Sequence, residues 1–316
     1  MLDFIGAIPG AASQGLIWGI MAIGVYITYK ILDVSDLTVD GSFATGGAVF
    51  VVLMIAGWNV WLAMLAAMIA GMLAGLVTGF FHTICGIPAI LAGILTQLGL
   101  WSVNLAVMGW SSNKAMNLNK VELLVSMRHM QEVEAGMLPF FRHPIVVVGA
   151  VVAVIIGLLY WFFGTERGAS IRATGANVNM ARAQGINTNV NKVIGLMIGN
   201  GLVALSGCLW AQYFGFAEIN MGRGAIVIGL AAIIIGDVTF GKIFNNFALK
   251  LLAVCLGSVI YYVVIQIVVS TMDINTNMLK LISALIVAAF LAVPYWKKQY
   301  FPAKKHHTAG KEKEHA

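Results

Sequence analysis

The chain is poor in charge and in cysteine, and both shortages narrow its class. Only 10% of its 316 residues are charged, whereas 60% are hydrophobic, a composition far from that of soluble domains. The three cysteines, Cys85, Cys208 and Cys255, lie in apolar surroundings without metal-ligand spacing, so we predict buried thiols and no metal site. The small charged fraction indicates an integral membrane protein.

Ionisable side chains are also scarce within the apolar runs. None falls at a predicted helix centre, which argues against a proton-driven carrier because such carriers titrate a group at depth. The acidic residues Asp33, Asp36 and Asp40 share one short polar stretch, where helix capping and loop solvation are favoured over a cation site. No nucleophile with a base and an orienting group can be assembled from spacing, so we predict neither a catalytic site nor a cofactor in this chain.

Long apolar segments dominate what is present. They cover residues 12–33, 43–57, 59–83, 87–110, 144–164, 193–215, 224–236, 246–271 and 279–296. Such segments are typical of an all-α polytopic membrane protein with about nine transmembrane or partly spanning helices. We therefore predict a single transmembrane domain over residues 1–296, followed by a disordered basic tail at 297–316 that favours anionic lipid rather than nucleic acid.

Two of the segments, 43–57 and 224–236, are too short to cross an apolar core of roughly 30 Å. Each is the second member of a pair, following segments 12–33 and 193–215. An odd number of crossings separates the pairs, so equivalent helices would run in opposite directions. Broken segments at matching places indicate an inverted repeat with a pathway near the midplane. A chance match among the segments is the alternative.

Uncharged polar residues within the spans are the candidates for such a pathway. Gln97, Asn104 and Asn200 are the strongest of them, and hydrogen bonding between neighbouring helices is the simpler explanation of each.

Lysine and arginine outside the spans predict the orientation. When the tail at 297–316 is placed inside, the inner side carries more lysine and arginine residues than the outer side. Without the tail, the two sides carry nearly equal numbers of these residues. This placement puts the N-terminus outside and the C-terminus in the cytoplasm. Residues 111–143 then form an external loop, which is either a docking surface or a solvated connector.

A polar segment, residues 165–192, interrupts the apolar chain and reads TERGASIRATGANVNMARAQGINTNVNK. It faces the cytoplasm in this orientation and carries basic residues on a short helical stretch suited to binding another protein. Arg172 and Arg182 are ten residues apart and cannot share one helix face, so we predict two short helices separated at Gly175. A solvated loop that follows the positive-inside rule is the alternative.

Four stretches of the sequence carry a family resemblance. They are GASIRATGAN at 168–177, ARAQGIN at 181–187, DLTVDGSF at 36–43, and IPAILAGILT at 87–96 with Asn104 and the Met108-Gly109 pair. The first two resemble the cytoplasmic signature of permeases in the branched-chain amino acid and ribose group of bacterial ATP-binding-cassette importers. The other two are similar to its amino-acid permease subgroup, which includes the tryptophan-type systems.

The resemblance implies a homodimeric permease in the bacterial plasma membrane. Its partners would be two cytoplasmic ATPase subunits, which bind ATP and Mg, and one external substrate-binding protein, lipid-anchored or periplasmic. In such systems a short cytoplasmic helix of the permease fits a groove on the ATPase. The coupling residues implied by the motif are Gly168, Ser170, Arg172, Gly175, Asn177, Arg182 and Gly185.

The resemblance leaves the solute open. A small solute is expected, an amino acid of the aromatic or branched-chain type, handed over by the external binding protein. The alternatives are an importer of sugars or nucleosides, an ion-coupled secondary transporter, and a membrane scaffold or exporter part.

Overall fold

A computed structural model describes most of the chain. It covers residues 2–118, 121–134, 136–137, 139–241, 243–272, 281, 284–290 and 292. The predicted all-α class is confirmed, with one short two-stranded sheet among the described residues. The predicted tail at 297–316 lies outside the described residues.

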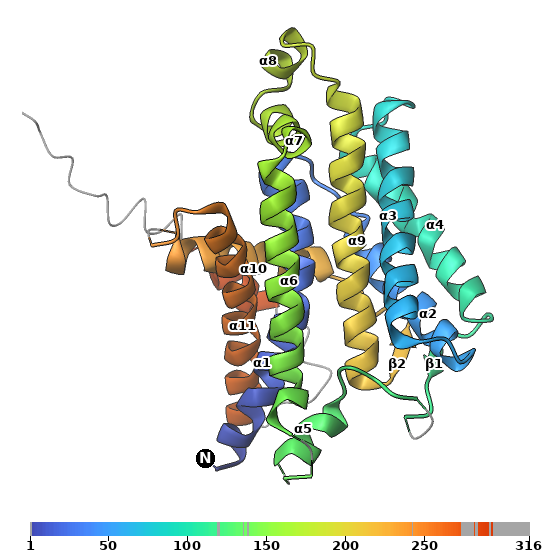
Figure 1. Cartoon of the computed structure of the whole chain (residues 1–316), viewed down its shortest axis with the longest axis vertical. Helices are drawn as coiled ribbons and strands as arrows, with labels where there is room; N and C mark the ends of the chain where they lie inside the picture. The colour runs from blue at the N-terminus through green and yellow to red at the C-terminus, as the bar shows by residue number, and fades with distance from the viewer. Residues whose placement is uncertain are drawn as a thin grey trace, which may run out of the picture.

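The described residues contain six helices long and apolar enough to cross a membrane. They are α1 (Leu2–Tyr26), which a π-helical turn η1 (Ile27–Ile31) continues, α3 (Val60–Thr83), α4 (Ala89–Val107), α6 (Pro144–Gly164), α9 (Thr188–Phe214) and α11 (Phe247–Met272). Most run along the long axis of the molecule (Figure 1). The chain is therefore a multi-pass membrane protein, whereas the count of nine stays a prediction because segment 279–296 is described only in part.

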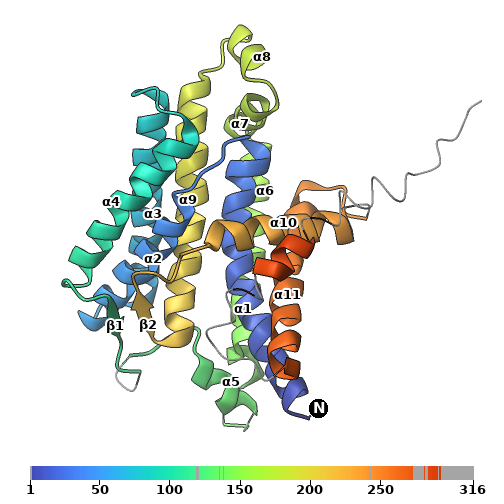
Figure 2. The same cartoon turned by 180° about the vertical axis from the view of Figure 1, so that it is seen from behind.

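Two shorter apolar helices, α2 (Val39–Ile55) and α10 (Ala225–Phe240), correspond to the two short segments of the sequence. The predicted start of α2 at residue 43 was four residues late, because Asp40 and the two residues after it belong to its first turn and not to a polar loop. Helix α10 lies across the bundle at about mid-height (Figure 2). Neither helix spans the molecule from end to end.

The helices form two triples with inverted directions. Helix α1 rises from the N-terminal end, whereas α9 descends from the opposite end (Figure 1). Helix α3 packs on α9 as α11 packs on α1, and α2 packs on α9 as α10 packs on α1. The second and third helices of each triple, α1–α2–α3 and α9–α10–α11, thus pack on the first helix of the other triple. Equivalent helices make equivalent contacts, as an inverted repeat requires.

The first helices of the two triples cross closely at a pair of glycines. A Cβ added at Gly24 of α1 would lie 2.6 Å from the carbonyl oxygen of Gly199 of α9, and one added at Gly199 would lie 3.1 Å from that of Gly24. Small residues allow such backbone approach in lipid, where hydrophobicity does not drive helix association.

The two polar loops predicted from the sequence lie at opposite ends of the bundle (Figure 1). One end carries α7 (Glu166–Ala176) and α8 (Val178–Ala183). The other carries α5 (Met127–Glu134), the 3-10 turn η2 (Phe140–Arg142) and the antiparallel pair β1 (Asn113–Ala115) and β2 (Phe216–Glu218), with Lys114 opposite Ala217.

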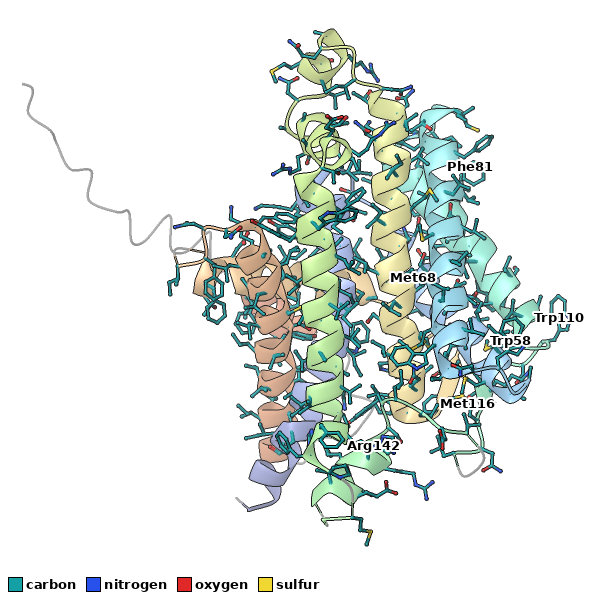
Figure 3. All side chains as sticks on the ribbon, viewed as in Figure 1. Trp58, Met68, Phe81, Trp110, Met116 and Arg142 are labelled. Atoms are coloured by element: carbon teal, nitrogen blue, oxygen red, sulfur yellow. The ribbon has the colours of Figure 1, made fainter. Side chains whose placement is uncertain are left out.

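Aromatic residues lie towards both ends of the bundle. Trp58 and Trp110 are exposed at the end near β1, whereas Phe81, which is half-buried, lies towards the other end (Figure 3). Aromatic side chains favour the two membrane–water interfaces. The prediction of buried thiols holds for Cys208 and Cys255 and is wrong for Cys85, which is exposed in the turn after α3 because the chain leaves the helix there.

Candidate functional site

The polar segment 165–192 folds into two capped helices at one end of the bundle. The Thr165 hydroxyl accepts a hydrogen bond from the Gly168 amide at 3.3 Å at the start of α7. The Asn177 side chain accepts one from the Met180 amide at 3.0 Å at the start of α8. The predicted pair of short helices is present, but the break lies at Asn177 and not at Gly175, because asparagine in extended backbone caps a new helix.

Gly175 and Gly168 have a different purpose, which is to let α7 approach its neighbours. A Cβ at Gly175 would overlap the carbonyl oxygen of Ile31, at the end of η1. A Cβ at Gly168 would overlap the backbone of Phe162 and Phe163 in α6. Both glycines therefore seat the polar segment directly on membrane-spanning helices.

A side-chain clamp joins α7 to the start of α9. The side-chain Nδ2 of Asn191 donates hydrogen bonds to the Ser170 hydroxyl at 2.7 Å and to the Thr174 hydroxyl at 2.9 Å. Asn191 is 2% exposed, so water competes little for these bonds. Helix α7 thus contacts the first helix of each triple, α1 through Gly175 and α9 through Asn191.

The predicted coupling arginines do not share a surface. Arg172 lines a cavity of about 930 Å³ between α6, α7 and α11, together with Lys30 and Lys250. Arg182 lies on α8 and donates to the Thr188 hydroxyl at 2.9 Å. Gly185 follows with a left-handed φ of 78°, which glycine adopts without strain. Of the two arginines, only Arg182 belongs to the tip of the segment, where Met180 is 59% exposed.

A buried polar network connects the two triples. Asn200 of α9 donates to the Asp36 carboxylate at 2.6 Å and accepts a hydrogen bond from the Ser42 hydroxyl of α2 at 2.6 Å. The other Asp36 oxygen accepts from the Thr38 amide at 2.9 Å. The Thr38 hydroxyl continues the network to that of Thr78 in α3, 2.6 Å away. Asn200 thus bonds its neighbours, as the simpler explanation of its role predicts.

The sequence-based reading of the acidic stretch is partly wrong. Asp33 is exposed, but Asp36 is 2% exposed, so an ionisable group does lie within the packed bundle. Asp40 caps a helix, as predicted, but the helix is α10: its carboxylate accepts from the amides of Gly224 at 2.9 Å and Ile226 at 3.1 Å. Because α2 is short, the chain returns into the bundle after α1, and the carboxylates of Asp36 and Asp40 lie inside the bundle. The short apolar segment at 43–57 is the sequence signal that could have predicted this position.

The other two pathway candidates meet at a second cavity, which we call the α4 cavity. Gln97 and Asn104 of α4 line this space of about 340 Å³ together with the start of α2. Asn104 is 1% exposed and donates weakly to the Gly41 carbonyl at 3.5 Å, whereas its Oδ1 atom has no hydrogen-bond partner in the described structure. Asn200 does not line this cavity. The structure therefore groups two of the three candidates and separates the third.

Comparison with known proteins gives the family of the chain. Residues 8–291 match the family described as "Branched-chain amino acid transport system / permease component". The chain belongs to this permease family. The permease is 40% identical over 288 residues to the tyrosine transport system permease protein of Clostridioides difficile, and the alignment covers 91% of each chain. The resemblance seen in the sequence motifs is thereby confirmed.

More distant relatives belong to other transport systems. The permease is 26% identical to the autoinducer 2 import system permease protein LsrC of Salmonella paratyphi B, over 72% of its own length and 62% of the relative's. No solved structure matches the permease.

Proposed function

We propose that the permease is the membrane subunit of an ATP-driven importer that moves an amino acid, with tyrosine or another aromatic amino acid as the leading candidate. The family match and the tyrosine transport permease among the relatives support this assignment. In this proposal two copies of the permease receive the solute from an external binding protein. A cytoplasmic ATPase dimer, which binds ATP and Mg, drives the cycle.

The observation that carries the proposal is the attachment of α7 to both triples. Helix α7 contacts the end of α1 at Gly175 and the start of α9 at Asn191. Asn191 and Asn200 are nine residues apart on α9, or about 13 Å at 1.5 Å per residue. A force applied by the ATPase to α7 therefore reaches the Asp36–Asn200 network through one continuous helix.

An ion-coupled carrier is the second candidate, because Asp36 is a carboxylate buried among the helices. Its two oxygens accept hydrogen bonds from Thr38 and Asn200. These donors hold the carboxylate in place and suit a fixed structural charge better than a group that must exchange ions. The import proposal is therefore favoured.

Co-purification of the permease with its ATPase tests the proposal. The double variant Arg172→Glu and Arg182→Glu is expected to lose the ATPase, because it reverses the charge at the tip of the polar segment. The single variant Arg182→Glu reverses the same charge and should lose the ATPase as well. Arg172→Glu alone should lose less, since Arg172 faces the cavity between α6, α7 and α11. Arg142→Glu, at the opposite end of the bundle, is the control and should retain the ATPase.

A double variant that retains the ATPase as the wild type does would contradict docking at this segment. Uptake of labelled tyrosine into proteoliposomes separates the two candidate functions. Import predicts a block by vanadate and no effect of ionophores, whereas an ion-coupled carrier predicts the reverse.

A further inference from the structure

The α4 cavity combines opposite charges, an aromatic face and an unused acceptor. Its walls include Asp40, Gln97, Trp101, Asn104 and Arg223. These residues come from the start of α2, from α4 and from the turn before α10, which begins near mid-height in the bundle (Figure 2). A volume of about 340 Å³ lies within the roughly 300–1,000 Å³ typical of small-molecule sites.

The buried acceptor is the first sign of a ligand. The Asn104 side chain is 1% exposed, and its Oδ1 atom has no hydrogen-bond partner among the residues that the structure describes. A buried polar atom without a partner lowers stability, so such atoms are rare and each requires an explanation, such as a donor from outside the chain. An N–H donor of a solute in this cavity would satisfy the Oδ1 atom.

The charges in the cavity are the second sign. Both oxygens of Asp40 accept backbone N–H groups of α10, so the positive end of that helix offsets its charge. Arg223 is exposed and forms no ion pair within the described part of the chain. An arginine near mid-height is costly against lipid. Its guanidinium therefore requires water, a second protein chain or an anionic ligand beside it.

Together these features point to a ligand with both charges. We propose that the α4 cavity is a waypoint on the solute path for a zwitterionic amino acid with an aromatic side chain. The Arg223 guanidinium binds the carboxylate, the Asn104 Oδ1 accepts from the ammonium group, and the ring packs on Trp101, which is 46% exposed. A neutral sugar would leave the arginine without a counter-charge. This inference rests on the proposed import function and adds where the solute binds and which groups contact it.

Uptake in proteoliposomes containing the permease, its ATPase and its binding protein tests the proposal. Tritiated L-tyrosine is the probe, and ATP hydrolysis stimulated by the loaded binding protein is measured in the same vesicles. Arg223→Gln, Asn104→Leu and Trp101→Leu are each expected to lower initial uptake by on the order of tenfold, the effect of one lost charge-assisted bond or ring contact. ATP hydrolysis should stay near the wild-type rate, because none of these residues lies at the polar segment.

Conservative variants separate ligand binding from folding. Asn104→Gln keeps the acceptor oxygen and the amide donor, Trp101→Phe keeps an aromatic face and Arg223→Lys keeps the charge, so each should retain most of the uptake. Trp110→Leu, outside the cavity, is the matched control and should transport normally.

The outcomes distinguish this inference from the proposed function. If the wild type shows no ATP-dependent uptake, the import function itself fails. The waypoint is wrong and the import function stands if the wild type transports tyrosine and the three cavity variants transport it within about twofold of the wild-type rate. The same conclusion follows if each variant and its conservative partner lose both uptake and stimulated ATP hydrolysis.

Discussion

At the scale of single residues, Asp36 and Asn200 form the polar junction between the triples. Each Asp36 oxygen has one donor, and Asn200 both donates to Asp36 and accepts from Ser42. All three side chains are at most 2% exposed. Removing one member therefore leaves a buried polar atom of its neighbour without a partner, in a medium that does not replace it.

The first prediction concerns this junction. Asn200→Leu should lower the free energy of unfolding by about 2–4 kcal/mol, because one oxygen of the Asp36 carboxylate and the Ser42 hydroxyl lose their partner. Asp36→Asn should cost much less, since the Asn200 amide can turn over and accept from the new NH₂ group. Thermal unfolding in detergent measures both effects, and Asp33→Asn, at a nearby exposed position, is the control.

Transport by the same variant tests the role of the carboxylate. Asp36→Asn should keep ATP-driven uptake at pH 6 and at pH 8, because the side chain at this position holds the structure through hydrogen bonds and transfers no proton. Complete loss of uptake in a variant that still folds would instead favour the ion-coupled carrier.

At the scale of elements, sequence patterns predicted which helices exist better than where they meet. The two short apolar segments and the paired helices of the polar segment follow from periodicity and capping residues. The break at Asn177 was not predicted although its capping signal is local, whereas the burial of Asp36 depends on contacts between distant parts of the chain. Gly175 illustrates the difference. The sequence predicts a helix break at this glycine, but the residue lies within α7, where close packing against Ile31, 144 residues earlier, requires a residue without a side chain.

The second prediction compares two helical glycines. Gly175→Ala should destabilise the permease by about 1–3 kcal/mol, because the new methyl group overlaps the Ile31 carbonyl. It should also let the ATPase hydrolyse ATP with reduced uptake. Gly157→Ala in α6 meets no atom of the described residues within 4 Å and should be neutral or stabilise by up to about 1 kcal/mol. Equal melting temperatures for the two variants would refute the proposed seating of α7.

At the scale of the whole molecule, its two ends differ in structure. The end with α7 and α8 presents short capped helices, whereas the other presents the sheet and α5 (Figure 1). Basic residues outside the tail are too evenly divided to orient the permease from sequence alone. Cys85 follows α3 and is exposed, while Cys208 and Cys255 are buried, so the chain carries a natural reporter of orientation.

The third prediction uses that reporter. Cys85 lies after α3, at the end of the bundle that carries α7 and α8 (Figure 1). A membrane-impermeant maleimide should leave Cys85 unlabelled in intact cells and label it in inverted vesicles, because the proposed ATPase contact requires this end in the cytoplasm. The converse is expected for Ser112→Cys in a Cys85→Ser background, since Ser112 is exposed beside β1 at the other end. Labelling of Cys85 from outside would reverse the orientation and remove the polar segment from reach of an ATPase.

The glycine crossing of α1 and α9 has a mechanical consequence. Gly24 is seven residues from Ile31, and Gly199 is eight from Asn191, so the arms gripped by α7 are about 10–12 Å long. From Gly199 to the end of α9 at Phe214 is 15 residues, an arm of about 22 Å. The crossing is thus a fulcrum with unequal arms. A scissor-like rotation about it moves the far end of α9 roughly twice as far as the end that α7 grips.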